Sequence, residues 1–239
     1  MDALWPQIVQ WFQSLGLHVD ASQAHAVAEG AARAAGQLDM PGLLALAAAL
    51  GWASGFRLYA VVFLVGGMGA AGWIALPPGL AVLQSPVVLL ASGFMLLVEF
   101  FADKLPWLDS LWDGLHAFIR VPAGALLAAG VFGADNASMA VVAGLLGGTL
   151  SATALATKMT ARAAANTSPE PFSNWGLSFL EDGLVVAVVW LATQHPLAFG
   201  IALVLALLVS ALLLVVLFKF LRAVLRRVSS VFSASAKVA

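Results

Sequence analysis

Hydrophobic residues in this chain form long uninterrupted runs rather than the short periodic patterns of a soluble fold. No acidic residue, lysine or arginine occurs between Arg57 and Glu99, or between Asp182 and Lys219. A helix that crosses a bilayer needs about 20 apolar residues, so each run has room for two spans. The turn-forming stretches "LPPG", "GADN", "TSPEP" and "QHP" separate the runs further. The pattern predicts six spans, at residues 42–71, 84–103, 113–133, 138–161, 174–194 and 197–221.

The segment before the first span has a different pattern. Ile8, Trp11 and Leu15 follow helical spacing, and Asp20 is a suitable N-cap for a second helix. We expect residues 1–41 to form amphipathic helices on the membrane surface or on the bundle. The segment lacks the basic start of a cleavable signal peptide, so we do not expect one.

Composition supports a membrane protein. Hydrophobic residues make up 62% of the 239 residues and charged residues 10%, against about a quarter charged in soluble proteins. Cysteine is absent, which excludes disulfides, thiolate metal sites and cysteine nucleophiles. The net charge of −1 indicates little, because in a membrane protein the positions of the charges carry the information.

The basic residues predict how the spans are oriented. They follow the second, fourth and sixth spans, whereas the loops after the first, third and fifth spans contain none. The positive-inside rule therefore places both termini in the cytoplasm. In residues 222–239 the bases are spaced to contact anionic lipid headgroups, although a simple stop-transfer anchor gives the same pattern. The residues concerned are Lys104, Lys158, Arg162, Lys219, Arg222, Arg226, Arg227 and Lys237.

Six spans divide into two sets of three, residues 42–133 and 134–221, which run in opposite directions. Each set opens with a glycine-interrupted helix, "LGWASGFRLYA" and "LGGTLSATALAT", followed by a helix with acids, "VEFFADK" and "SFLEDG". Paired interrupted helices are typical of binding sites in transporters built from inverted repeats. Close packing of helices through small residues is the alternative, and the sequence leaves both open.

Charged residues inside the spans are the candidates for a functional site. A charge at the bilayer centre costs about 2.5 to 3.5 kcal/mol, so each one needs a partner or a wet cavity. Such residues mark transported ions, protons or anionic substrates, or else they form structural ion pairs. The candidate substrate- or ion-binding residues are Arg57, Glu99, Asp103, Arg120, Lys158, Glu181 and Asp182.

Specific partners can be predicted from depth. Glu99 and Arg120 flank the same loop at similar depth, so we expect them to pair. Glu181 or Asp182 is expected to meet Arg57 or Lys158. Because Glu181 and Asp182 are adjacent on a helix they point in different directions, so one partner is not expected to satisfy both.

The loops between spans contain oxygen ligands of the kind that suit Mg²⁺, Ca²⁺ or Mn²⁺. Helix caps are the alternative role for several of them, and the metal question is left open. These residues are Asp103, Asp109, Asp113, Asn166, Ser168, Glu170, Ser173 and Asn174. Trp107, Trp112 and Trp175 fit an aromatic belt at the membrane surface.

Other site chemistries have little support. The four histidines are scattered, and only His116 lies near a candidate residue, Arg120. No phosphate-binding glycine loop or nucleic-acid-binding patch occurs. We therefore expect neither an enzyme nor a bound cofactor nor a nucleic-acid partner.

The stretches "GWASGFRLYA", "EFFADKLPWLDSLWD", "IRVPAGALLA" and "ANTSPEPFSNWGLSFLEDG" resemble the bacterial membrane family known as domain of unknown function 4126. The resemblance covers roughly residues 42–194 and implies a polytopic inner-membrane protein without an assigned activity. A looser similarity is to Golgi-type manganese and calcium exchangers with an E-x-x-D-K/R-T/S motif. Here "EFFADKL" has an extra residue between its acids and lacks the Thr or Ser, which argues against the same cation geometry.

The sequence therefore predicts an all-α polytopic membrane protein that acts as a small secondary transporter or channel-like carrier. Glu99, Glu181 and Asp182 would bind an ion or proton, with Arg57 and Arg120 as counter-ions. The alternatives are a carrier of anionic lipid or phosphorylated substrate, and a scaffold or assembly factor that transports nothing. The bilayer and a small ion or anionic solute are the expected partners, and homo-oligomerisation is left open.

Overall fold

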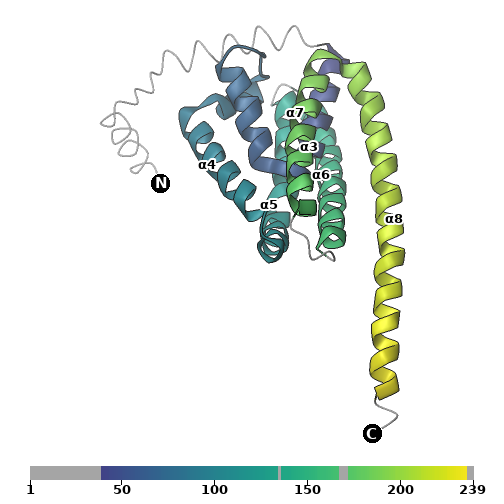
Figure 1. Cartoon of the computed structure of the whole chain (residues 1–239). Coiled ribbons are helices and arrows are strands. Elements are labelled where there is room, and N and C mark those ends of the chain that lie inside the picture. The colour runs from purple at the N-terminus through teal and green to yellow at the C-terminus, as the bar shows by residue number, and fades with distance from the viewer. Residues whose placement is uncertain (1–38, 134–135, 167–171, 236–239) are drawn as a thin grey trace, which may run out of the picture.

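The computed structural model describes residues 39–133, 136–166 and 172–235, which are helical with short connections (Figure 1). The predicted amphipathic helices before residue 39 lie outside the described residues. The described helices are α3 (Met40–Ala70), the 3₁₀ helix η1 (Pro78–Gln84), α4 (Pro86–Ala102), α5 (Pro106–Phe132), α6 (Ala137–Ala165), α7 (Phe172–Gln194) and α8 (Pro196–Ser235).

Helix starts follow local capping chemistry. The Asp39 carboxylate accepts a hydrogen bond from the Gly42 N–H at 3.0 Å, and Ser85 caps α4 through the Val88 N–H at 3.3 Å. Both helices have proline in their first turn, where a missing N–H costs nothing. These caps set the α3 and α4 boundaries within two residues of the predicted spans.

Five described helices are long and apolar enough to cross a membrane, and a sixth if η1 and α4, bent by 68°, form one broken span. The described residues are therefore those of a helical, multi-pass membrane protein.

Helix α3 is broken near its centre. Arg57 has φ −145° and ψ 82°, outside the helical region. The arm before it runs parallel to α6: a Cβ on Gly51 would lie 2.5 Å from the Gly147 Cα, and Gly55 packs on Ser151 one turn further. This arm therefore runs from the Ala137 end of α6 towards its Ala165 end.

The second arm of α3 runs back. Phe63 packs on Gly93 of α4, and Gly66 packs on the Leu83 carbonyl of η1. Within η1, Gly79 meets Gly130 near the end of α5. Since α5 and α6 are joined at that end, the two ends of α3 lie on the same side of the bundle. The predicted single crossing at residues 42–71 is therefore wrong. Its two halves are helical arms that run in opposite directions and form a re-entrant hairpin with Arg57 at its apex.

This hairpin changes the topology around it. The start of α3 lies at the end of the bundle where α8 starts, and α8 runs from there along the full depth of the bundle and beyond it (Figure 1). Met40 therefore lies at the opposite end from Lys219, which follows the start of α8 by 23 residues. The predicted cytoplasmic N-terminus depends on residues 1–38, which lie outside the described residues.

Helix α6 remains continuous through "LGGTLSATALAT". Its small residues serve close packing: Gly147 meets Gly51 and the Ala128 side chain, and Ser151 meets Gly124. The close-packing alternative therefore holds for this stretch. Because α3 breaks and α6 does not, an inverted repeat is not confirmed.

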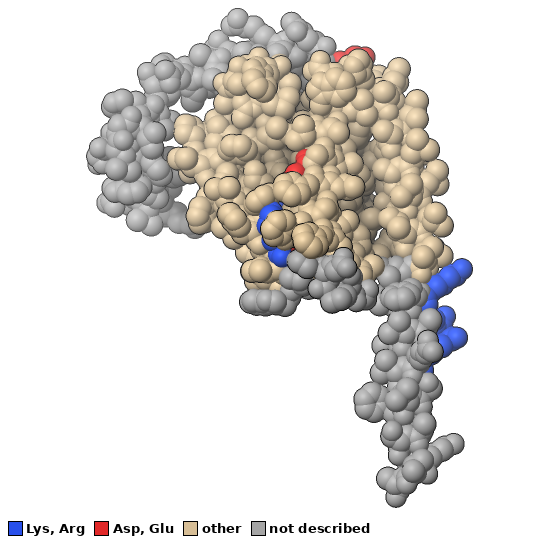
Figure 2. Space-filling view, viewed as in Figure 1, with Lys and Arg blue, Asp and Glu red and all other residues tan. Residues whose placement is uncertain are grey.

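Helix α8 differs from the others in its exposure. Its 40 residues correspond to about 60 Å, twice the thickness of a bilayer core. Most residues of its apolar part, Pro196–Val216, are not buried by the rest of the described chain. Lys219, Arg222 and Arg226 are exposed beyond it, and the helix continues through the predicted tail boundary at residue 222 (Figure 2).

The close approach of α3 and α6 predicts a sharp glycine requirement. Gly55→Ala should destabilise the protein by about 1–3 kcal/mol, because the new Cβ would overlap the Ser151 carbonyl and lie 2.6 Å from the Ala154 Cβ. Gly67→Ala on the second arm is the matched control. It meets nothing within 4 Å and should be neutral or slightly stabilising. Unfolding in detergent measures both, and equal effects would contradict the packing described here.

Candidate functional site

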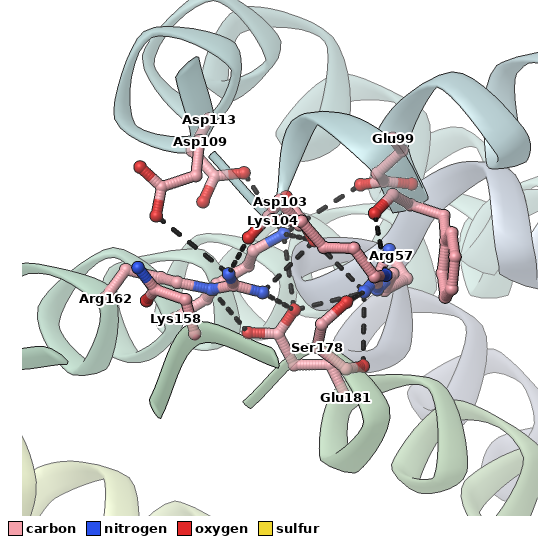
Figure 3. Close-up of polar contacts among 12 residues, drawn as sticks. Arg57, Glu99, Asp103, Lys104, Asp109, Asp113, Lys158, Arg162, Ser178 and Glu181 are labelled. Atoms are coloured by element: carbon pink, nitrogen blue, oxygen red, sulfur yellow. Dashed lines mark hydrogen bonds and ion pairs between the residues drawn. The ribbon is translucent and has the colours of Figure 1, made fainter. Parts of the chain in front are cut away.

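Ten charged side chains converge around the apex of the α3 hairpin (Figure 3). We call them the charged network; all are buried except Asp182, whose side chain is 32% exposed. They come from five helices or their ends, with two carboxylates each from α4 or its C-cap, α5 and α7. Its members are Arg57, Glu99, Asp103, Asp109, Asp113, Arg120, Lys158, Arg162, Glu181 and Asp182.

The network lies near one end of the bundle rather than at mid-depth. Lys158 precedes the end of α6 at Ala165 by seven residues, and Ser178 follows the start of α7 at Phe172 by six. At 1.5 Å per residue, both lie about 10 Å from those helix ends. Arg57 is near the middle of the α3 sequence, but it lies near this end of the bundle because the hairpin turns back there.

Arg57 joins the hairpin to α4 and α7. Its Nη2 lies 3.1 Å from Asp103 Oδ2, and it donates to the Ser178 hydroxyl at 2.6 Å and the Ser178 carbonyl at 3.2 Å. Its Nε lies 3.0 Å from Asp182 Oδ1 and 3.6 Å from Glu181 Oε2. Arg57 thus lies within ion-pair distance of both adjacent acids, but its Nε makes no hydrogen bond to either, and Glu181 accepts its hydrogen bonds from Arg162.

Lys158 stabilises the break in α3 through a backbone hydrogen bond. A carbonyl at a helix break loses its intrahelical donor and needs another. The Phe56 carbonyl, one residue before the break, accepts a hydrogen bond from Lys158 Nζ at 3.2 Å. The same ammonium lies 3.1 Å from Asp113 Oδ1 and 3.5 Å from Glu181 Oε2. The expected contact between Lys158 and Glu181 is confirmed.

The predicted pair of Glu99 and Arg120 is also confirmed. Arg120 Nη2 donates to Glu99 Oε1, and Arg120 Nη1 donates to Asp113 Oδ1 at 2.6 Å. Both side chains of the predicted pair are fully buried. Arg120 thereby holds the end of α4 against α5.

Arg162 completes the network and links the α4 to α5 turn with α7. It donates to the Asp103 carbonyl at 2.7 Å and to Glu181 Oε2 at 3.0 Å, and its Nη2 lies 3.2 Å from Asp103 Oδ2. Asp103 is the C-cap of α4, just outside the spanning segment. Burial alone would raise the pKa of Asp103, but Lys158, Arg57 and Arg162 together hold that pKa below its usual value.

Three members of the charged network, Asp109, Asp113 and Arg162, were predicted in other roles, as oxygen ligands of a loop and as a basic residue that flanks a span, and the hydrogen-bonding Ser178 was not predicted. For the charged residues, helical spacing is the feature of the sequence that indicates their place in the network. Asp109 and Asp113 are four residues apart, as are Lys158 and Arg162, so each pair shares one helix face. Asp113 pairs with Arg120 and Lys158 and does not cap α5, whose N-cap is Leu105.

The proposed loop ligands do not form a metal site in the described chain. Among the described residues, no group of three or more His, Asp or Glu side chains is arranged to hold a metal ion. Asn166 donates to Asp109, and Asn174 donates to Asn166 at 2.6 Å. Ser168 and Glu170 lie outside the described residues.

The aromatic residues near the network have structural contacts. His116 has its Nδ1 2.9 Å from the Trp112 carbonyl and stacks on the Trp112 ring at 4.0 Å between centroids. It also meets the Tyr59 ring edge-on. Trp175 is exposed, as expected of a residue in an interfacial belt, and the side chain of Trp107 lies outside the described part.

An apolar groove leads to the network from the bilayer side. It encloses about 330 Å³ between the second arm of α3, α4 and α7, with Phe63 and Phe100 among its lining residues. Of the described residues that line it, Asp182 alone is charged. Figure 2 shows a small exposed acidic patch in the middle of an apolar face, with basic atoms below it.

The family comparison matches the region that contains this site. A family model described as domain of unknown function 4126 matches residues 44–216. The chain belongs to this family. Every member of the charged network lies within the matched region of this DUF4126 chain. No curated protein and no solved structure matches the chain.

Several buried polar atoms of this DUF4126 site have no hydrogen-bond partner in the described part of the chain. They are Arg57 Nε and Nη1, Glu99 Oε2, Asp103 Oδ1, Asp113 Oδ2 and Arg120 Nε. Buried polar atoms are normally satisfied, and those that are not call for an explanation. The network therefore combines many close ion pairs with hydrogen-bonding capacity that remains for a proton, an ion or a solute.

The pairing of Arg120 predicts a large stability effect. Arg120→Gln should lower the free energy of unfolding by about 3–5 kcal/mol, because it leaves the Glu99 carboxylate buried without its arginine. Lys219→Gln on the exposed part of α8 is the control and should change stability by less than about 0.5 kcal/mol. Unfolding of purified protein in mixed detergent micelles measures both. A small effect at Arg120 would show that the network contributes little to holding the bundle.

Proposed function

We propose that this protein is a small ion- or proton-coupled secondary carrier of the bacterial inner membrane. The observation that supports this function best is the charge balance of the network, where, among the residues that the structure describes, six carboxylates face four cationic side chains. Lys104, half-buried at the edge, adds a fifth cation, which leaves one carboxylate in excess.

An excess charge in a buried network has a physical consequence. An uncompensated charge in a low-dielectric site is costly, so the site favours an additional proton or bound cation. A network that can hold this positive charge as either a proton or another cation can exchange one for the other. Glu99, Glu181 and Asp182 would be the exchanging carboxylates, with Arg57 and Arg120 as their counter-ions.

The hairpin supports the same proposal. Broken helices in carriers free backbone groups at a site and provide a hinge. Here the break places Arg57 among acids from α4 and α7, so a shift of either helix would change which acids it compensates. The first helices of the two predicted sets, α3 and α6, supply cations, and the second helices, α4 and α7, supply acids. This correspondence favours the inverted-repeat hypothesis, although only α3 is broken.

The two alternatives have unequal support. A scaffold without transport is favoured by the density of ion pairs, which would fix helix register with little net stabilisation. A carrier of anionic lipid or phosphorylated substrate has less support, because each buried cation already contacts carboxylates. For orientation, the side of the bundle with Lys104, Arg162 and Lys219 is proposed to be cytoplasmic.

The test is to adsorb proteoliposomes to a solid-supported membrane and record currents after steps in pH or in Na⁺, K⁺, Mg²⁺, Ca²⁺ or Mn²⁺ concentration. A carrier of this kind should give a transient charge displacement on a pH step, since protons bind within the membrane field. Glu181→Gln and Glu99→Gln should remove most of it, and Lys219→Gln should leave it unchanged.

A wild-type protein that gives no current with any of these steps would contradict the carrier and favour the scaffold. Elution as a single species and an unchanged melting temperature identify the variants that are folded. Glu181→Gln is the more informative of the two, because the Glu181 side chain is 4% exposed whereas that of Glu99 is fully buried, so the substitution at Glu181 is less disruptive to the fold.

A further inference from the structure

We propose that the groove between α3, α4 and α7 binds a monovalent organic cation with an apolar body, which makes ion-pair contact with Asp182. This inference names the substrate class of the carrier and therefore rests on the proposed function. Four observations support it: the lining of the groove, the exposure of Asp182, the aromatic faces beside it and the charge balance of the network.

The shape and lining of the groove fit an apolar molecule. At about 330 Å³ it is at the lower end of the range for small-molecule sites. Its walls are aliphatic and aromatic side chains, including Ala60, Leu97 and Val186. The surrounding helix surfaces are apolar and face the bilayer, so a ligand could enter from the hydrocarbon region without crossing water.

Asp182 gives the groove its charge preference. Its side chain is 32% exposed, whereas those of Glu99 and Glu181 are at most 4% exposed. Its ion-pair contact is with Arg57 Nε at 3.0 Å, an atom without hydrogen-bond geometry to any described partner. Asp182 is thus the most accessible and least satisfied acid in a network with one carboxylate in excess. A single positive charge beside it would complete the balance.

Aromatic side chains next to Asp182 suit a cation that is weakly hydrated. Phe63 and Phe100 both line the groove. The Lys104 ammonium already lies 2.9 Å from the centre of the Phe100 ring and donates to the Phe100 carbonyl at 3.1 Å. Cations are attracted to ring faces, most strongly where water is excluded. Lys104 shows that this edge of the groove accommodates an ammonium group, and its charge should also oppose a second cation nearby.

Because Asp182 is negative and Lys104 is positive, substitutions at these residues should change the affinities for cations and anions in opposite directions. Asp182→Asn removes the attraction for a cation, whereas Lys104→Gln removes a repulsion. An organic cation should therefore bind roughly tenfold or more weakly to Asp182→Asn and more tightly to Lys104→Gln. An amphiphilic anion should respond in the reverse sense to both variants.

The experiment measures binding to the purified full chain in detergent by equilibrium dialysis. The probe is radiolabelled tetraphenylphosphonium, compared with tetraphenylborate, an anion of the same shape, and with tetramethylammonium, a cation without the apolar body. Val186→Trp fills the groove at an exposed lining position, and Val204→Trp on exposed α8 is its matched control. We expect saturable binding of tetraphenylphosphonium that Asp182→Asn weakens roughly tenfold or more, that Val186→Trp abolishes and that Val204→Trp preserves.

Preferential binding of tetraphenylborate, strengthened by Asp182→Asn, would overturn the proposal in favour of an amphiphilic anion. Binding that persists in both Asp182→Asn and Val186→Trp would show partition into the micelle and would equally overturn it. Because this assay needs no transport, the two proposals can fail separately. Proton currents without cation binding would reject only the substrate class, and cation binding without any current would reject only the carrier.

Discussion

The structure depends on the compensation of Arg57 at the apex of the α3 hairpin. A broken helix turned back inside the bundle exposes backbone carbonyls and a guanidinium to a region with little water. Here Asp103, Ser178 and Asp182 contact the guanidinium, and Lys158 satisfies the carbonyl of Phe56. The hairpin requires these partners, and their charges in turn require Arg120 and Arg162. The charged network and the fold of the hairpin therefore depend on each other.

Packing of small residues positions the α3 hairpin, and ion pairs compensate the charges at its apex. Small residues bring α3, α5 and α6 together at Gly51, Gly124 and Gly147, where a Cβ would not fit. That contact fixes the first arm of the hairpin and the depth of Arg57. The second arm packs on η1 and α4, which leaves the groove open between α4 and α7. As a result, the one partly exposed acid of the network faces the bilayer side.

Much of this arrangement could be predicted from the sequence, for identifiable reasons. Apolar runs and caps indicate the helices, and equal distance from a shared loop identifies the pair of Glu99 and Arg120. The reversal of α3 could not be predicted, because an apolar helix of 31 residues reads the same whether it crosses the bilayer or turns back. Asp109, Asp113 and Arg162 were predicted only as loop ligands or flanking bases, because residues near helix ends usually face water, whereas the apex of the hairpin reaches them here. The carrier function stays a proposal, supported by the charge excess that these residues reveal.

The re-entrant hairpin is the central claim, and cysteine accessibility tests it most directly. The chain contains no cysteine, so Met40→Cys, Ala71→Cys and Lys219→Cys each provide a unique site for a membrane-impermeant maleimide. In vesicles of defined orientation, residues 40 and 71 should be labelled from the same side and residue 219 from the other. Labelling of residues 40 and 71 from opposite sides would mean that α3 crosses the membrane, and it would contradict the account of the apex given above.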